Sequence, residues 1–328
     1  MVFMYSIWLG SAVGTASGLL YVGYRMLLAG YLMLKGQNGL QVLLGDSLLR
    51  VAVPVLALYV LYQLFFWKTR VNPGFRQYFM DFVRAYPYFA TTGLVFDNKQ
   101  PDERVQIEPN DKNMFAFHPH GVTSLGWSYN GVYNHSLMHS DLRWLVTSAI
   151  FFIPVLRNMM AWIGAEPIEK NHVKRLLSES RNVCLIPGGY EKATIYERNK
   201  HRVYMRHRAG FIKLALQHGY KVHPVYTFGE EQSFYAFPYL LSWRLLLNRV
   251  KLPGCMIVGV WWCFFLPFPN INLITVVGDP IQLPKIDKPS RADVSKYHSI
   301  YIKALEDLFE RNKAKYATAG ANAKLEIF

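Results

Sequence analysis

Two histidines in one short turn are the first residues of this chain that could do chemistry. His118 and His120 stand in the sequence His-Pro-His-Gly, directly after the apolar run 114–117, which is short enough to be a buried strand. Pro119 cannot donate to a neighbouring strand and Gly121 permits unusual backbone angles, so we expect the chain to turn here. An imidazole at a strand end is suited to removing a proton from a hydroxyl group that attacks an acyl group.

Two other interpretations of this turn stay open from the residues alone. Both histidines could be core side chains with satisfied hydrogen bonds. They also form an H-x-H pair that could bind a metal ion, with His135 and His139 as further ligands. We expect no metal site, because no cluster of acidic residues stands near the predicted strand ends in the pattern that such a site needs.

A second glycine-rich turn carries an acidic residue. Pro187, Gly188 and Gly189 follow the predicted strand 183–186, and Glu191 comes shortly after them. A carboxylate beside an imidazole can fix its tautomer and stabilise its protonated form, so Glu191 is a candidate partner for the turn histidines. A solvated turn carboxylate is the alternative. The nucleophile elbow of serine hydrolases and the glycine-rich nucleotide-binding motifs are absent.

Basic residues follow the second turn and dominate the chain as a whole. The local run could hold the phosphates of an anionic cosubstrate, or it could be a solvated face; its members are Arg198, Lys200, Arg202, Arg206 and Arg208. The 328 residues carry a net charge of +14, while 52% are hydrophobic and only 18% are charged. This charge favours an anionic partner, and the apolar excess favours a membrane over nucleic acid.

The N-terminal part is the apolar end of the chain. Val2 to Tyr24 carries no charged side chain, and its length meets the roughly 20 apolar residues that a bilayer span needs. A second uncharged run, 51–67, ends in aromatic residues after the polar connector 35–47, so we expect a two-helix membrane hairpin. An interfacial segment is the alternative for the first run. Three cysteines without framework spacing argue against a disulfide scaffold and for a domain that faces the cytosol.

From about residue 71 the composition is that of a globular domain. Helical patterns alternate with short apolar strands from residue 90 onward, which predicts an α/β domain with a mixed, mostly parallel sheet flanked by helices. We therefore divide the chain into a membrane hairpin, 1–70, and a catalytic domain, 71–328. Within the latter, helices are expected over 206–218 and 292–315. The aromatic stretch within 254–277 is either core or a surface loop that dips into lipid.

Taken together, these motifs resemble those of the type-2 diacylglycerol acyltransferase family, which includes monoacylglycerol and wax-alcohol acyltransferases. The resemblance covers roughly residues 71–316. It rests on the His-Pro-His-Gly turn, the Pro-Gly-Gly turn with Glu191, the block from Arg208 to Glu230, the block 276–281 and the helix 297–309. It implies a fold like that of the glycerolphosphate acyltransferases.

The resemblance also implies roles for individual residues. The catalytic residues would be His118, His120 and Glu191. The substrate-binding residues would be Pro119, Gly121, Pro187, Gly188, Gly189, Arg202, Arg206, Arg208, Gly210, Phe211 and Glu230. Two departures stand out, since many members carry the acid of the Gly-Gly motif where this chain has Lys192, and Thr123 stands where an H-x-x-x-x-D motif would have its aspartate.

The activity that the resemblance implies is an acyl-CoA-dependent O-acyltransferase that makes neutral lipid from diacylglycerol, giving triacylglycerol. Monoacylglycerol and fatty alcohols are the alternative acceptors. The implied partners are membrane lipid, fatty acyl-CoA as cosubstrate and the acceptor, with an oligomer left open and no cofactor. The implied location is the endoplasmic reticulum membrane and the lipid droplet surface. A metal-dependent hydrolase and a non-catalytic lipid-binding protein are the alternatives from other classes.

Overall fold

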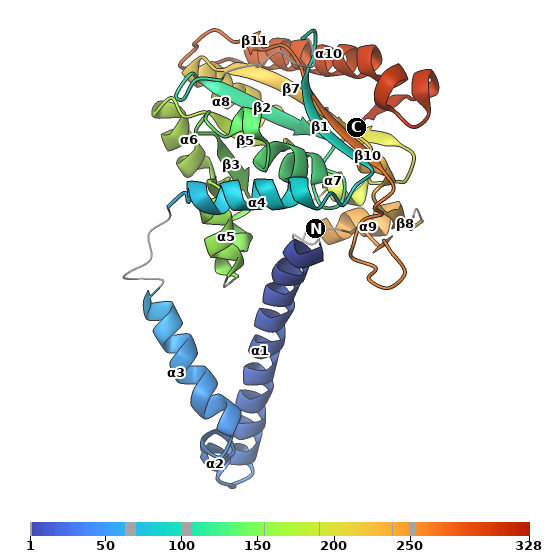
Figure 1. The fold of residues 1–328 in the computed structure, drawn as a ribbon. Coiled ribbons are helices and arrows are strands. Elements are labelled where there is room, and N and C mark those ends of the chain that lie inside the picture. The colour runs from blue at the N-terminus through green and yellow to red at the C-terminus, as the bar shows by residue number, and fades with distance from the viewer. Residues whose placement is uncertain are drawn as a thin grey trace. The chain divides into compact units, whose positions relative to one another are not determined.

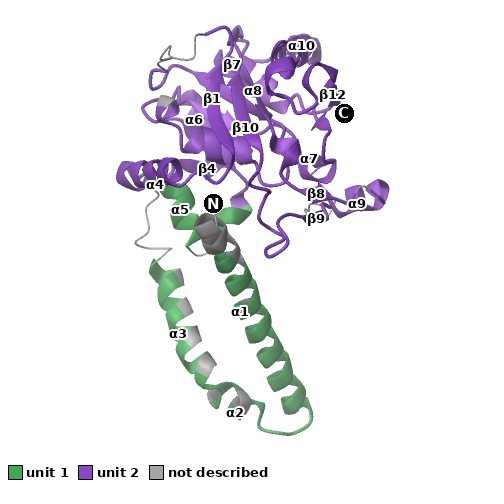
Figure 2. Ribbon diagram, turned by 45° about the vertical axis from the view of Figure 1, so that its right-hand side comes forward, with its two compact units in different colours: residues 1–71, 149–162 green, residues 72–148, 163–328 purple. Residues whose placement is uncertain are grey.

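The computed structural model describes residues 2–62, 70–99, 107–153, 155–189, 191–237, 239–248 and 254–328. The chain forms two compact units, residues 1–71 with 149–162 and residues 72–148 with 163–328, which Figure 2 colours separately. Residues 149–162, which we expected within the catalytic domain, cluster with the N-terminal helices.

The smaller unit is helical. It contains α1 (Val2–Leu34), α2 (Gly39–Leu44), α3 (Ser47–Leu61) and α5 (Leu156–Trp162), and the short helix η4 (Ser148–Phe152) leads into it. Helix α1 continues beyond the predicted run through Arg25, whose Nε lies 3.0 Å from Oδ2 of Asp46. By length and composition, Val13–Leu34 could cross a membrane, whereas the apolar segment Leu49–Tyr59 is shorter. Residues 63–69 of the second predicted run lie outside the described residues.

The larger unit is built on an eight-stranded sheet in the order β1-β10-β7-β2-β5-β3-β4, with β11 on β7. Its strands are β1 (Thr91–Phe96), β2 (Asn113–His118), β3 (Arg143–Val146), β4 (Ala165–Pro167), β5 (Val183–Leu185), β7 (Lys221–Phe228), β10 (Asn272–Val277) and β11 (Ile281–Gln282). All pairs are parallel except the two antiparallel pairings of β7 with β10 and β11. The predicted mixed, mostly parallel sheet is confirmed (Figure 1).

Two small sheets and several helices complete this unit. The small sheets pair β6 (His201–Val203) with β12 (Leu325–Ile327) and β8 (Tyr235–Ala236) with β9 (Ile257–Val258). The helices are α4 (Pro73–Ala85), α6 (Lys170–Ser178), α7 (Glu191–Thr194), α8 (Gly210–His218), α9 (Leu241–Leu247) and α10 (Arg291–Tyr316), with a π-helix η2 (Gly126–Val132) and short 3₁₀ turns η3 (His135–Leu137), η5 (Glu230–Gln232) and η7 (Gly320–Asn322).

Helix boundaries follow local chemistry. Ser290 and Asp293 form a reciprocal capping box that starts α10 close to the predicted position. The predicted helix 206–218 is wrong at its beginning, because the amides of Met205 and Arg206 both bond to the Phe328 carbonyl and α8 starts only at Gly210. It ends, as expected, before Gly219, whose φ of 66° suits glycine.

The central strand β2 decides which way the site residues point. Successive side chains of a strand face opposite sides of the sheet. Met114 and Ala116 belong to the core cluster that α6, α8 and α10 form on one face. Phe115 stacks on His223 at 4.4 Å, and Phe117 packs edge-on against Trp144. His118 comes two residues after Ala116, so its side chain lies on the same face of the sheet as Met114 and Ala116. This is the face that α10 covers.

The aromatic stretch after β9 is a surface loop. Trp261 is 92% exposed, and Trp262, Phe264 and Phe265 are exposed as well. The loop is closed by backbone hydrogen bonds between Gly259 and Phe264. The two predicted alternatives for the stretch within 254–277 were core and surface loop. The exposed aromatic residues form a surface loop, and the strand β10 that follows is part of the core.

Candidate functional site

The two predicted turns meet at one edge of the sheet. Strand β2 pairs in parallel with β5, with Ala116 opposite Leu185, and β2 also pairs in parallel with β7. Because parallel strands end at the same edge, the His-Pro-His-Gly turn after β2 lies beside the Pro-Gly-Gly turn after β5. Glu191 and the turn histidines, which were predicted to be partners, therefore stand in or next to neighbouring turns.

His118 is a buried side chain with a defined partner. It is 0% exposed, and its Nε2 lies 2.8 Å from the hydroxyl of Tyr301 on α10. The same hydroxyl lies 3.4 Å from the Ala116 carbonyl, while Nδ1 of His118 has no hydrogen-bond partner among the described residues. Burial holds the pKa of His118 well below its usual range, and the charge of Lys192 lowers it further. The contact with Tyr301 anchors the His118 ring and, with it, the turn.

His120 is the turn histidine that remains accessible. It is partly exposed, and its Nδ1 lies 3.1 Å from the Gly121 carbonyl. A carbonyl oxygen only accepts, so Nδ1 carries the proton of the neutral ring and Nε2 carries the lone pair. No described residue bonds to Nε2. Burial, and after it the charge of Lys192, lower the pKa of His120 to about 4, so the ring is neutral at neutral pH.

Glu230 braces the turn from behind. Its Oε1 and Oε2 accept hydrogen bonds from the amides of Leu125 and Gly126 at 2.9 and 2.8 Å. Gly121 has a φ of 58°, and a Cβ there would lie 2.3 Å from Oε1 of Glu230, so only glycine fits. Glu230 is 0% exposed, and burial raises its pKa to about 8. Both carboxylate oxygens of Glu230 accept from backbone amides, and its predicted role in substrate binding stays a prediction.

Glu191 does not pair with an imidazole. Its Oε1 lies 2.5 Å from Nη2 of Arg208, and no hydrogen bond joins it to either turn histidine in the described part of the chain. The predicted pairing fails because the guanidinium is a closer and stronger partner for the carboxylate. The structure instead directs the neighbouring Lys192 inward. Lys192 is only 6% exposed, and its Nζ bonds to the Ile186 carbonyl.

Two functional candidates were missed from the sequence. Lys192 packs against Gly188, where an added Cβ would lie 2.1 Å from Cε of the lysine. Tyr301 lay within the apolar stripe of the predicted helix 292–315, and a hydroxyl in such a stripe is the one signal that could have marked it. Pro119, whose peptide bond to His118 is cis, and Gly189 are partly buried within their turns.

Most of the predicted basic run serves the fold. Arg202 pairs with Glu197 at 2.6 Å and with Glu326 at 2.7 Å, and Nε of Arg206 bonds to the Ile327 carbonyl at 2.9 Å. These contacts fasten the C-terminal strand β12. The predicted substrate-binding roles of Arg202 and Arg206 are therefore not supported by their positions.

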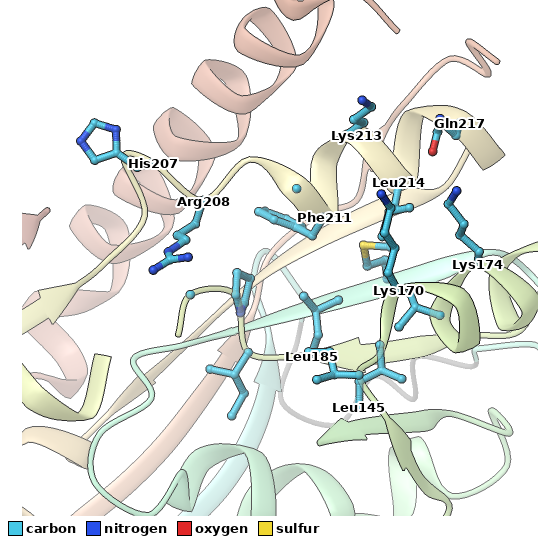
Figure 3. Close-up of a pocket in the computed structure, with 17 residues that line it drawn as sticks. Leu145, Lys170, Lys174, Leu185, His207, Arg208, Phe211, Lys213, Leu214 and Gln217 are labelled. Carbon is cyan, nitrogen blue, oxygen red and sulfur yellow. The ribbon is translucent and has the colours of Figure 1, made fainter. Parts of the chain in front are cut away.

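A cavity of about 550 Å³ opens beside the Pro-Gly-Gly turn. Of the predicted substrate-binding residues it contains Pro187, Gly188, Arg208, Gly210 and Phe211. Figure 3 shows Arg208 at one end and Lys174 with Gln217 at the other, with Leu145 and Leu185 on the floor. Apolar walls with cations at both ends suit a ligand that is part chain and part phosphate.

The described residues contain no cluster of side chains that could bind a metal ion. No group of three or more His, Cys, Asp or Glu side chains lies close enough there to hold an ion.

The fold and the site define a class. It is an α/β protein with an imidazole at the end of a central strand, whose Nε2 bonds to no described residue, and with an apolar cavity with cationic ends beside the neighbouring glycine turn. A family model described as diacylglycerol acyltransferase matches residues 47–327. The chain belongs to the diacylglycerol acyltransferase family, as the motifs predicted, and it is an acyltransferase.

Curated relatives agree with this assignment. The chain is 28% identical over 285 residues to the mouse diacylglycerol O-acyltransferase 2-like protein 6, covering 80% of this chain and 83% of the relative. It is 30% identical to diacylglycerol O-acyltransferase 2 of Dictyostelium discoideum, covering 63% and 67%. It is 31% identical to the human 2-acylglycerol O-acyltransferase 3, covering 63% and 66%.

Among solved structures, the chain is similar to the 1-acyl-sn-glycerophosphate acyltransferase PlsC from Thermotoga maritima. The TM-score is 0.40 at 12% sequence identity, with 87% of this chain and 96% of the other covered.

Proposed function

We propose that this protein transfers a fatty acyl group from acyl-CoA to the hydroxyl of diacylglycerol, giving triacylglycerol, with His120 as the general base. Monoacylglycerol and fatty alcohols are the alternative acceptors, since each presents one hydroxyl beside an apolar body. The proposal rests chiefly on one observation, the unbonded Nε2 of His120, whose ring is fixed in the required tautomer by the Gly121 carbonyl.

The proposed reaction needs no bound cofactor. Nε2 of His120 takes the proton of the acceptor hydroxyl as its oxygen attacks the thioester carbonyl. The tetrahedral intermediate then collapses, the C–S bond breaks, and the CoA thiolate recovers the proton from the imidazolium. The low pKa of His120 keeps the ring neutral and ready to accept this proton at neutral pH. Backbone amides of the glycine turns are the candidate donors to the oxyanion.

We also propose that the catalytic unit works at a membrane surface. Its loop at 261–265 exposes two tryptophans and two phenylalanines, and the neighbouring α9 exposes Trp243. Tryptophan is enriched where a bilayer meets water. Together with the apolar stretch Val13–Leu34, this supports the predicted location at the endoplasmic reticulum membrane and lipid droplet surface, with the catalytic unit on the cytosolic side.

The test is an assay of membranes that contain this enzyme as their only acyltransferase, given labelled oleoyl-CoA and one acceptor at a time. We expect labelled triacylglycerol from diacylglycerol. His120→Ala should lower turnover at least about 10²-fold, the usual loss for a general base, with protein amount in the membrane unchanged. His139→Ala, at an exposed histidine, is the matched control.

Three outcomes would reject the proposal. Near-normal turnover of His120→Ala would show that His120 is not the general base. Loss of activity after chelation of metal ions would favour the hydrolase alternative, and no use of acyl-CoA with any acceptor would favour a non-catalytic protein.

A further inference from the structure

We infer that Lys170, Lys174 and Lys213, on helices α6 and α8, bind the phosphates of the CoA nucleotide, so that CoA lies along the cavity with its thioester at the Gly188 end. This inference rests on acyl-CoA being the donor, as proposed above. It assigns to three lysines, none of which was predicted to bind substrate, a role that the predicted basic run does not fill.

Most arginines of the basic run are not available to bind phosphate, because other groups of the protein already hold them. Arg202 is held between two carboxylates, and Arg206 bonds to a backbone carbonyl. Arg198 bonds to the Gln232 carbonyl and lies over the ring of Tyr235 at 4.6 Å. Arg208 reaches the cavity, but its charge is offset by Glu191. CoA carries several phosphate charges, so other cations must compensate them.

The three lysines are the cations that remain. All three line the cavity and are exposed, and none forms an ion pair with a described residue. Lys170 and Lys174 are four residues apart on α6, so they lie on one face of that helix. Lys213 lies on α8. Figure 3 shows the two α6 lysines beside Leu214, with Lys213 and Gln217 at the same end and Arg208 at the opposite end.

The cavity between these ends matches the chemistry of the rest of CoA. Its walls are mainly apolar, with Val173, Leu185, Phe211 and Leu214 among them. Such walls suit the uncharged pantetheine arm, which joins the thioester to the phosphates. The Gly188 end is the reactive end, because Gly188 stands in the turn after β5, which lies beside the His-Pro-His-Gly turn after β2.

A second hollow continues past the lysines. Its volume is about 560 Å³, and it shares Lys174 and Gln217 with the cavity. Arg175 and His218 also line it, together with Asp287, which lies 3.8 Å from Lys285. Burial lowers the pKa of His218, and so do the charges of Lys112, Lys285 and Lys174, which shows that this hollow is electropositive. An adenosine with a 3′-phosphate would fit its charge.

The experiment compares two donors. Oleoyl-CoA carries the nucleotide, and oleoyl-pantetheine carries the same thioester without it. In membranes, the triple variant Lys170→Gln, Lys174→Gln, Lys213→Gln should raise KM for oleoyl-CoA at least about tenfold with little change in kcat. KM for oleoyl-pantetheine should not change. Lys324→Gln, at an exposed lysine of the same unit, is the control and should leave both KM values unchanged.

Three outcomes would overturn the inference. These are an unchanged KM for oleoyl-CoA, an equal rise for both donors, and loss of the triple variant from the membrane fraction at unchanged KM, which would assign the lysines to an anionic lipid surface. Failure of the proposed function looks different, because the wild-type protein would then consume neither donor.

Discussion

The hydroxyl of Tyr301 lies 2.8 Å from Nε2 of His118, and it ties the C-terminal helix α10 to the turn that presents His120. This contact separates the roles of two histidines that look equivalent in the sequence. His118 is fully buried and fixes the turn, whereas His120 is partly exposed and its Nε2 bonds to no described residue. Glu230 holds the other side of the same turn through two backbone amides.

Tyr301→Phe tests the anchoring role of His118. The change leaves Nε2 of a buried ring without its partner, which we expect to cost about 1–3 kcal/mol in the free energy of unfolding. Turnover should fall by less than in His120→Ala, since the base is retained. Thermal unfolding and the oleoyl-CoA assay measure the two effects. Tyr297→Phe, on the same helix and partly exposed, should change neither; equal effects from both tyrosines would contradict the anchoring role.

Gly121→Ala should disrupt the turn. Its Cβ would lie 2.3 Å from Oε1 of Glu230, and the φ of 58° is strained for alanine. We expect a lower unfolding midpoint and loss of most activity. Gly93→Ala is the matched control, since its Cβ would meet Ile274 only at an ordinary 3.6 Å. Activity close to wild type in Gly121→Ala would show that Glu230 does not brace the turn.

Gly210→Leu probes the cavity without disturbing the core. Gly210 lines the cavity, and a Cβ there would have no heavy atom within 4 Å. A leucine should therefore project into the space proposed for the donor, raising KM for acyl-CoA several-fold while leaving the unfolding midpoint unchanged. Gly210→Ala is the smaller control. An unchanged KM for the leucine variant would place the donor elsewhere.

Lys192→Met tests how the charge of Lys192 acts on the base. The pKa of His120 is about 4, through burial first and Lys192 second, and His120 is active when neutral. Activity of the wild type should therefore persist on acidification until the pH approaches 4. Removing the positive charge makes protonation of His120 easier, so the acid limb of kcat/KM should move to higher pH. An acid limb that stays in place or moves down would contradict this coupling.

Stability should also depend on pH in both directions. Burial lowers the pKa of several histidines below the usual value, so the unfolded chain binds their protons first and stability falls as the pH drops below roughly 6.5; four of them are His118, His120, His201 and His223. Burial raises the pKa of Glu230 to about 8 and of Glu231 to about 7, so stability is lost as the pH rises through these values. Below pH 6.5, the four histidines change the free energy of unfolding more than the two carboxyl groups do.

We therefore expect maximum stability near pH 6.5, on the order of the unperturbed histidine pKa. Unfolding midpoints of the full chain in detergent, measured from pH 4.5 to 8.5, check this. Glu231→Gln should weaken the decline between about pH 6.5 and 7 and make the fall below pH 6.5 steeper, because this carboxyl opposes the histidines there. A midpoint that rises from pH 7 to 8 in the wild type would contradict the assignment.

The parts of the site that could be predicted are those encoded locally. The strand before His118, the glycine turns and the stop of α8 at Gly219 each follow from a few neighbouring residues. The parallel order of strands then brings both turns to one edge of the sheet, as expected. The second predicted membrane run is 51–67, and its residues 63–67 lie outside the described residues.

The choice of partners could not be predicted from sequence, because it is made across long separations. Glu191 and Lys192 are adjacent, and only the packed turn decides that the acid meets Arg208 while the lysine is buried. Tyr301 is 183 residues from His118. Arg202 and Arg206 were expected at the substrate, but the C-terminal strand, more than 100 residues later, occupies both of them.

The contact between His118 and Tyr301 also sets a time order during synthesis. The ribosome makes the turn 183 residues before the tyrosine that secures it. At about 5–20 residues per second, this gap lasts roughly 10 to 40 s. A nascent chain therefore carries both imidazoles well before the contact that anchors their turn can form.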